Sequence, residues 1–244
     1  MRDEGERIKM TCVCSGGLFS AMRRDIDRCV YSLHGERRAS VMGLARVAIL
    51  FPALWVTLLY RLCHFFSDRC RPKFLGKILL AFTFIPFRFL GIAIGVEINP
   101  RAHIGAGVLI NHFGGIHIGP VVIGENCNIS HGVTIGRSSR IHGSNMDSVT
   151  EFFDAPNIGN RVWIGPGAVI AGPVTLGADS VIAGNSLVTR DVPPRGVAMG
   201  VPAKTVSHKG SFQQVSYRGM DQDADLLAVL AELQAMKTAE SSSE

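Results

Sequence analysis

The sequence predicts a mainly β protein in which a parallel β-helix follows an α-helical N-terminal domain. Two features of the second half of the chain carry this prediction: aliphatic residues recur every six positions, and glycine follows many of them directly. The first 93 residues differ, because they hold long apolar stretches between clusters of Arg, Lys and Asp, with few glycines and prolines inside the stretches. That sequence pattern is typical of helices.

A six-residue repeat runs through residues 94–206. Its most regular part has six aliphatic residues spaced by six without a slip: Ile158, Ile164, Ile170, Leu176, Ile182 and Val188. An earlier series keeps the same step in two runs with a one-residue slip between them: Ile98, Ile104, Ile110 and Ile116, then Ile123, Ile129, Ile135 and Ile141. A period of six is a multiple of two but not of 3.6, so these side chains share one face only if the chain is extended and turns regularly. A β-sandwich, the ordinary alternative, has less regular turns, so the repeat favours a parallel β-helix.

The domain organisation follows from this repeat. We expect a helical N-terminal domain over residues 1–93, the β-helix over 94–206 and a tail over 207–244. The period stops between Ile141 and Ile158, which predicts that residues 142–157 form a loop extruded from the solenoid. Apolar residues at helical spacing predict a short helix between Asp221 and Lys237 in the tail. The exposed sides and open ends of a β-helix favour a homotrimer or a dimer of trimers.

Composition excludes some classes of partner. The chain has 25 Lys and Arg against 20 Asp and Glu, but these residues are scattered and no nucleic-acid motif accompanies them, so we expect no nucleic-acid binding. The six cysteines lack metal-site spacing, which predicts a reducing, cytoplasmic location and no metal site. No secretory signal is visible at the start of the chain.

Two apolar runs raise the question of a membrane. Residues 47–60 and 78–87 carry no charge, yet both runs are shorter than the roughly 20 residues that a spanning helix needs. Pro52 and Pro86 interrupt them, which favours buried helices. Peripheral contact with the inner face of a membrane stays open, because basic residues flank the runs.

Two motifs give the sequence a family resemblance. Residues 96–112 read VEINPRAHIGAGVLINH, and residues 200–204 read GVPAK. Together with FPALWVTLLYRLCHF at residues 51–65, they resemble serine O-acetyltransferases and their relatives in the hexapeptide-repeat acyltransferase superfamily. The resemblance covers about residues 20–206 and implies a left-handed β-helix, with acetyl-CoA as co-substrate.

The resemblance places the catalytic base at His112. An alcohol is a poor nucleophile at neutral pH, and an imidazole that takes its proton contributes roughly 10² to 10⁴ in rate. The alternative is that His112 is a solvated residue of the coil.

Departures from the family's pattern concern the acceptor. Asn111 and Glu97 stand where serine acetyltransferases have Asp residues, and Asp154-Ala155 stands where they have an Arg-His pair before the proline. His142, in the expected loop, is a candidate substitute. We therefore expect a glycan or sugar hydroxyl as the acceptor, with serine as the alternative small-molecule acceptor and a non-catalytic scaffold as the third interpretation.

Further site residues are expected along the coil. His131 is a candidate substrate-binding residue or a packed turn residue. The resemblance implies that the pantetheine arm of CoA lies near Pro166, Gly172 and Gly184. Arg195 and Lys204 are candidates for binding its phosphates, where a fixed positive charge is useful, although structural roles are equally open.

Overall fold

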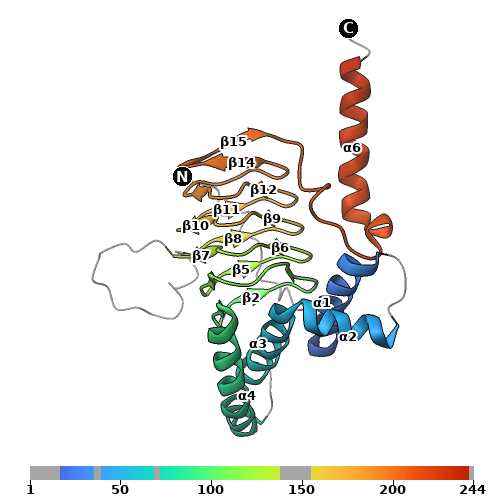
Figure 1. Cartoon of the computed structure of the whole chain (residues 1–244). Helices are drawn as coiled ribbons and strands as arrows, with labels where there is room; N and C mark the ends of the chain where they lie inside the picture. The colour runs from blue at the N-terminus through green and yellow to red at the C-terminus, as the bar shows by residue number, and fades with distance from the viewer. Residues whose placement is uncertain (1–16, 36–39, 69–71, 138–154, 242–244) are drawn as a thin grey trace, which may run out of the picture.

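A three-sided parallel solenoid forms the centre of the protein, between the N-terminal helices and the C-terminal helix (Figure 1). The structure is a computed structural model, and it describes residues 17–35, 40–68, 72–137 and 155–241. The first sheet contains β1 (Val96–Ile98), β4 (Ile116–Ile118), β7 (Thr134–Gly136), β10 (Val169–Ala171) and β13 (Leu187–Val188). The second contains β2 (His103–Ile104), β5 (Val122–Ile123), β8 (Asn157–Ile158) and β11 (Thr175–Leu176). The third contains β3 (Leu109–Ile110), β6 (Asn128–Ile129), β9 (Trp163–Ile164), β12 (Val181–Ile182), β14 (Val197–Gly200) and β15 (Ala203–Ser207).

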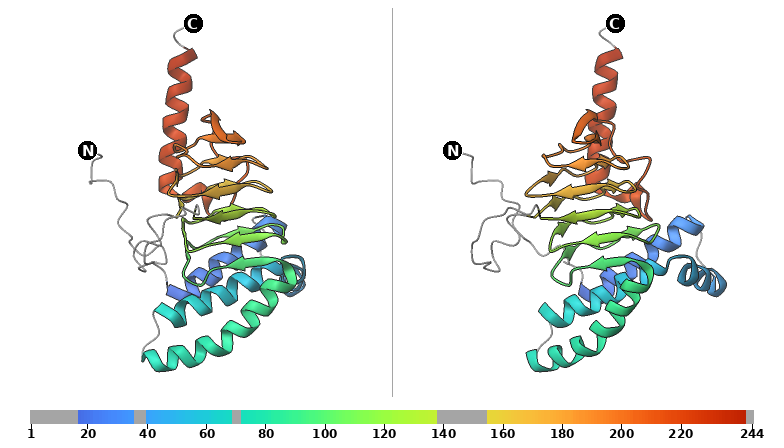
Figure 2. Two further views of the ribbon diagram at one scale, coloured as in Figure 1. Left: turned by 90° about the vertical axis from the view of Figure 1, so that its left-hand side faces the viewer. Right: turned by 60° about the vertical axis from the view of Figure 1, so that its left-hand side comes forward.

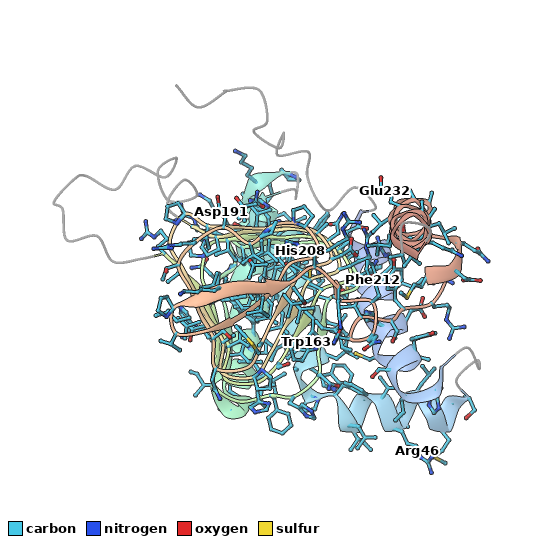
Figure 3. The ribbon with its side chains drawn as sticks, turned by 90° about the horizontal axis from the view of Figure 1, so that it is seen from above. Arg46, Trp163, Asp191, His208, Phe212 and Glu232 are labelled. Atoms are coloured by element: carbon cyan, nitrogen blue, oxygen red, sulfur yellow. The ribbon has the colours of Figure 1, made fainter. Side chains whose placement is uncertain are left out.

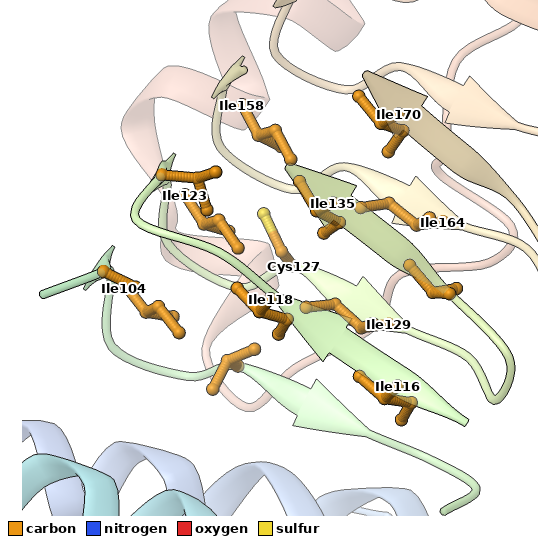
Figure 4. Close-up of a cluster of buried hydrophobic side chains, with 14 of the residues drawn as sticks. Ile104, Ile116, Ile118, Ile123, Cys127, Ile129, Ile135, Ile158, Ile164 and Ile170 are labelled. Atoms are coloured by element: carbon orange, nitrogen blue, oxygen red, sulfur yellow. The ribbon is translucent and has the colours of Figure 1, made fainter. Parts of the chain in front are cut away.

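The predicted left-handed β-helix is confirmed. Each coil visits the three sheets in turn and pairs in parallel with the next coil, except that β15 folds back antiparallel on β14. The predicted aliphatic series fills the interior, where the isoleucines stack coil on coil (Figure 4). Ile123, Ile129 and Ile164 are fully buried. Ile141 lies outside the described residues.

One detail of the predicted register is wrong. The residue that pairs with Ile98 on the next coil is Ile118, two places after the expected Ile116. Ile116 is also buried, since β4 points both its first and third residues inward. The step from Ile110 to Ile118 is therefore eight residues instead of six, and the turn at residues 111–115 holds two extra residues.

The expected loop also ends earlier than predicted. Residues 138–154 lie outside the description, but Ala155 and Pro156 are buried and Asn157 opens β8. Ala155 belongs to the solenoid core.

The predicted N-terminal domain forms four helices at one end of the solenoid: α1 (Gly17–His34), α2 (Val41–Leu50), α3 (Pro52–Asp68) and α4 (Lys73–Ile94). Ser40 caps α2, because its hydroxyl accepts a hydrogen bond from the Gly43 N–H at 3.2 Å. Gly95 ends α4 in a left-handed conformation at φ 68°, which suits glycine, and the chain then enters β1.

The two apolar runs differ in how far they are buried. The run at residues 47–60 is largely buried, as predicted, with Val56 and Tyr60 fully inaccessible. The prediction is wrong for the run at residues 78–87, because α4 packs mainly on α3 and leaves Phe82 75% exposed. By length and composition α4 could cross a membrane, as could α2 and α3 taken together as a pair bent by 87°.

A buried ion pair joins the helices to the first coil. Arg61 of α3 donates from Nε to Asp25 of α1 at 2.9 Å, and both side chains are almost inaccessible. The guanidinium also donates to the carbonyls of Ile104 and Gly105, while the Asp25 carboxylate accepts from the N–H groups of Gly107 and Val108. Every strong polar group in the cluster therefore has a partner across the boundary between helices and solenoid.

The C-terminal segment returns along the solenoid before its helix begins. A 3-10 turn, η2 (Met220–Gln222), precedes α6 (Ala224–Ser241), so the predicted short helix is longer and starts later. The start of α6 packs through Leu226, which is 1% exposed. Seen along the solenoid in Figure 3, α6 with Glu232 stands outside the coils.

We expect breaking the buried Asp25–Arg61 pair to be strongly destabilising. Arg61→Met leaves a buried carboxylate unpaired and should lower the free energy of unfolding by about 3–5 kcal/mol. The control is Arg24→Met, which removes a half-exposed pair with Glu125 (3.0 Å) between the same two parts and should cost below about 1 kcal/mol. Urea denaturation measures both, and equal losses would contradict the assignment.

Candidate active site

One corner of the solenoid, where the third sheet turns into the first, collects half of the predicted site residues: Asn111, His112, His131, Pro166 and Gly184. Backbone bonds stack its turns: Gly132 N–H donates to the Gly114 carbonyl (2.8 Å), Gly167 N–H to that of His131 (2.9 Å) and Asn185 N–H to that of Pro166 (2.7 Å). Gly114, His131, Pro166 and Gly184 consequently form a line parallel to the solenoid axis. We call these four residues the corner column.

His112 projects beside this column because its turn is longer. The two extra residues between Ile110 and Ile118 cannot be accommodated in the stacked backbone, so Asn111, His112 and Phe113 are exposed. The His112 and His131 rings lie with centroids 5.7 Å apart at an angle of 73°. The structure thus brings these two predicted residues together.

Asn111 contacts the proposed base directly. Its side-chain nitrogen lies 3.3 Å from Nε2 of His112. An amide either donates or accepts a hydrogen bond, so Asn111 can orient the imidazole. It carries no charge, however, and cannot stabilise an imidazolium as an aspartate would.

Glu97 lies on β1 and has other partners. Its carboxylate accepts a hydrogen bond from Arg88 of α4 at 2.8 Å and is 3.2 Å from Nδ1 of His117 on β4. The bond from Arg88 is the main reason that the pKa of Glu97 lies below its usual value, followed by the contact with His117. Within the single chain, the contacts of Glu97 are therefore with Arg88 and His117 and not with His112. Its role in orienting His112 stays a prediction.

These three side chains line a groove of about 320 Å³ between the end of α4 and the first sheet. Gly115 also lines it. Gly115 follows His112 by three residues, so the groove begins within roughly 11 Å of the His112 Cα. Sequence reasoning missed Arg88 and His117 as groove residues, because only the packing of α4 and of β4 against β1 brings them together with Glu97.

The predicted cofactor residues separate in space. Pro166 and Gly184 belong to the corner column, whereas Gly172 lies at the corner between the first and second sheets, where its N–H donates to the Gly136 carbonyl. Arg195 lies at the remaining corner and its guanidinium is 3.8 Å from Glu232 of α6.

The closing motif lies near the column. Gly200 N–H donates to the Ser186 hydroxyl at 3.2 Å, which joins the motif to the last turn of that corner. Lys204 follows on β15 and is exposed. His142 and Asp154 lie outside the described residues.

Comparisons with known proteins agree with this geometry. Residues 155–190 match the family model "Bacterial transferase hexapeptide (six repeats)". A serine acetyltransferase of Mycobacterium tuberculosis is 34% identical over 78% of this chain and 73% of its own length, and one of Helicobacter pylori is 35% identical over 66% and 85%. The chain belongs to the serine acetyltransferase family.

Solved members of this family have the same architecture. Brucella abortus serine acetyltransferase in complex with coenzyme A superposes with a TM-score of 0.61 at 26% identity, over 79% of this chain and 68% of that one. Soybean serine acetyltransferase complexed with serine gives 0.58 at 30% identity, over 78% and 69%. The protein is thus an acyltransferase enzyme with acetyl-CoA as its co-substrate. Among the two acceptors considered from the sequence, these relatives favour serine over a saccharide.

A substitution in the corner column tests where acetyl-CoA binds. A side chain at Gly184 would project against the Pro166 carbonyl, with its Cβ 3.2 Å from that oxygen. If the pantetheine arm lies along the corner column, Gly184→Leu should obstruct it and raise KM for acetyl-CoA about tenfold, which corresponds to about 1.4 kcal/mol of lost binding free energy. Thr175→Leu, which adds the same side chain at an exposed site on the second sheet, should leave KM unchanged. Equal KM values in both variants would place the cofactor elsewhere.

Proposed function

We propose that this enzyme transfers the acetyl group of acetyl-CoA to the side-chain hydroxyl of L-serine, with His112 as the general base. The observation that carries the proposal is the position of His112. It lies at the end of the resemblance motif, on an extended turn that exposes it, in a chain 34–35% identical to serine acetyltransferases.

The chemistry needs one base that acts twice. The His112 imidazole takes the proton of the serine hydroxyl as that oxygen attacks the thioester carbonyl carbon. The tetrahedral intermediate then collapses with cleavage of the carbon–sulfur bond, and the imidazolium returns the proton to the departing thiolate. The products are O-acetylserine and CoA. A positioned imidazole of this kind contributes roughly 10² to 10⁴ in rate.

The groove beside His112 supports an amino-acid acceptor. Free serine carries a carboxylate and an ammonium group, and the groove offers Arg88 and His117 for the first and Glu97 for the second. This arrangement would replace the family's Arg-His pair, whose second position is taken here by Ala155 in the solenoid core.

A saccharide remains the second candidate acceptor, on one specific observation. Asn111 contacts His112 without a charge, and Ala155 offers no polar side-chain group, so neither of these two positions supplies a charge for an amino acid. A sugar hydroxyl needs the base and a few neutral hydrogen bonds only. The homotrimer or dimer of trimers expected from the sequence stays a prediction for either acceptor.

His112→Ala should reduce acetyl transfer by roughly 10² to 10⁴ while CoA binding is retained. Thiol release from acetyl-CoA measures turnover, with L-serine in one series and sugars and nucleotide sugars in the other. His131→Ala is the matched control, because it removes the neighbouring imidazole of the same corner and should cost less. Full activity of the His112 variant would overturn the assignment of the base, and release with sugars alone would replace serine by a saccharide.

Arg88→Gln should raise KM for serine about tenfold, since a charged hydrogen bond to the carboxylate is lost, and should leave KM for acetyl-CoA unchanged. Lys77→Gln removes an exposed cation from the same helix away from the groove and should change neither constant. An unchanged KM for serine in the Arg88 variant would exclude the groove as its binding site.

A further inference from the structure

Helix α4 has two apolar faces, and the solenoid uses only one. Residues facing α3 recur every three or four positions and are packed, including Gly76, Phe87 and Gly91. A second series with the same spacing lies on the opposite side of the helix, because successive residues turn by about 100°. Its members are exposed by 40–75%: Leu75, Ile78, Phe82, Ile85, Phe89 and Ile92. We call this series the outer face of α4.

The outer face lies at an end of the molecule. Both views in Figure 2 show α4 as the element farthest from β15, with α3 between it and the rest of the helices. Contiguous exposed apolar surface of this kind marks an interaction site in a folded protein.

The charges near the outer face of α4 distinguish between two partners that would cover it, a second copy of the chain and a membrane surface. Neither α2 nor α4 contains an acidic residue, and their charged residues are Arg46, Lys73, Lys77 and Arg88. Lys73 and Lys77 are exposed at the start of α4, while Arg88 is paired with Glu97. Twofold pairing of α4 with a second copy would add only positive charge to the contact.

The residue types on the outer face also favour a membrane surface over a second copy of the chain. The outer face has the alternating three- and four-residue spacing that a coiled coil would also show, but Phe occupies two of its positions and the exposed Pro86 lies within the helix between them. Phe with Leu and Ile on one face, bordered by Lys, is typical of helices that lie in a membrane interface. The solenoid-bound face of α4 and the anchoring of α3 through Arg61 exclude insertion of the whole helix.

We propose that the outer face of α4 inserts into the surface of a lipid bilayer that contains anionic headgroups, with Lys73 and Lys77 against the headgroups. The enzyme would then be held at the membrane with the solenoid and its corner column directed away from it. This inference does not depend on the identity of the acceptor.

Co-sedimentation of the full chain with vesicles tests the proposal. The protein should sediment with vesicles of phosphatidylcholine mixed with phosphatidylglycerol and less with phosphatidylcholine alone, and added salt should weaken but not abolish binding. Phe82→Glu/Phe89→Glu should lower the bound fraction about tenfold or more, because charges replace inserted rings. Lys73→Gln/Lys77→Gln should lower affinity for the anionic vesicles by roughly fivefold per lysine.

The matched control is Phe19→Glu, the same change at a residue of α1 that is 84% exposed, and it should bind like the unmodified chain. Thermal unfolding checks that the double variant is folded, and Phe82→Ser/Phe89→Ser provides a milder replacement if it is not. Vesicle binding that is absent, or unaffected by both double variants, would overturn the proposal. A drop in particle mass on light scattering for the double variant, without vesicle binding of the unmodified chain, would assign the outer face to contacts between copies instead.

Discussion

Stacking of each coil on the next is the constraint on which the rest of this structure depends. Backbone groups of one coil bond to those of the next on all three sheets, so each coil must keep nearly the same length. Extra residues cannot join these backbone hydrogen bonds, so they bulge outward at a corner. The two additional residues of the turn at residues 111–115 are expelled in this way, and they carry His112 into solvent. The exposure of His112 is thus a consequence of the regularity around it.

The helical domain is held to this regular body by few polar contacts with large effects. Asp25 and Arg61 are buried together and satisfied by four backbone groups of the first coil, which fixes the direction in which α1 and α3 leave it. That direction places the end of α4 against β1, so Arg88 reaches Glu97 and the groove forms beside His112. The same placement leaves the outer face of α4 at the end of the molecule. The acceptor groove and the exposed apolar face therefore have one structural origin.

The departures from the family's motif change which charged groups lie near His112. Asn111 contacts the imidazole and carries no charge, and Ala155 is part of the core, so neither side chain supplies a charged group. Arg88, His117 and Glu97 supply charges of both signs a short distance away. Serine acetylation in this enzyme would accordingly rely on groups from α4 and the first sheet.

The sequence by itself determined the solenoid and its buried aliphatic series, because a six-residue period is a property of neighbouring residues. It also indicated a helical region in front of the repeat and, through a local motif, the candidate base His112, whose role stays a prediction. Only the tertiary structure decided the true register at Ile118, the alignment of His131, Pro166 and Gly184 on one corner, and the separation of Gly172 and Arg195 from it. These depend on how coils of unequal length stack. The exposure of α4 was likewise beyond the sequence, since an apolar helix reads the same whether one or both of its faces are covered.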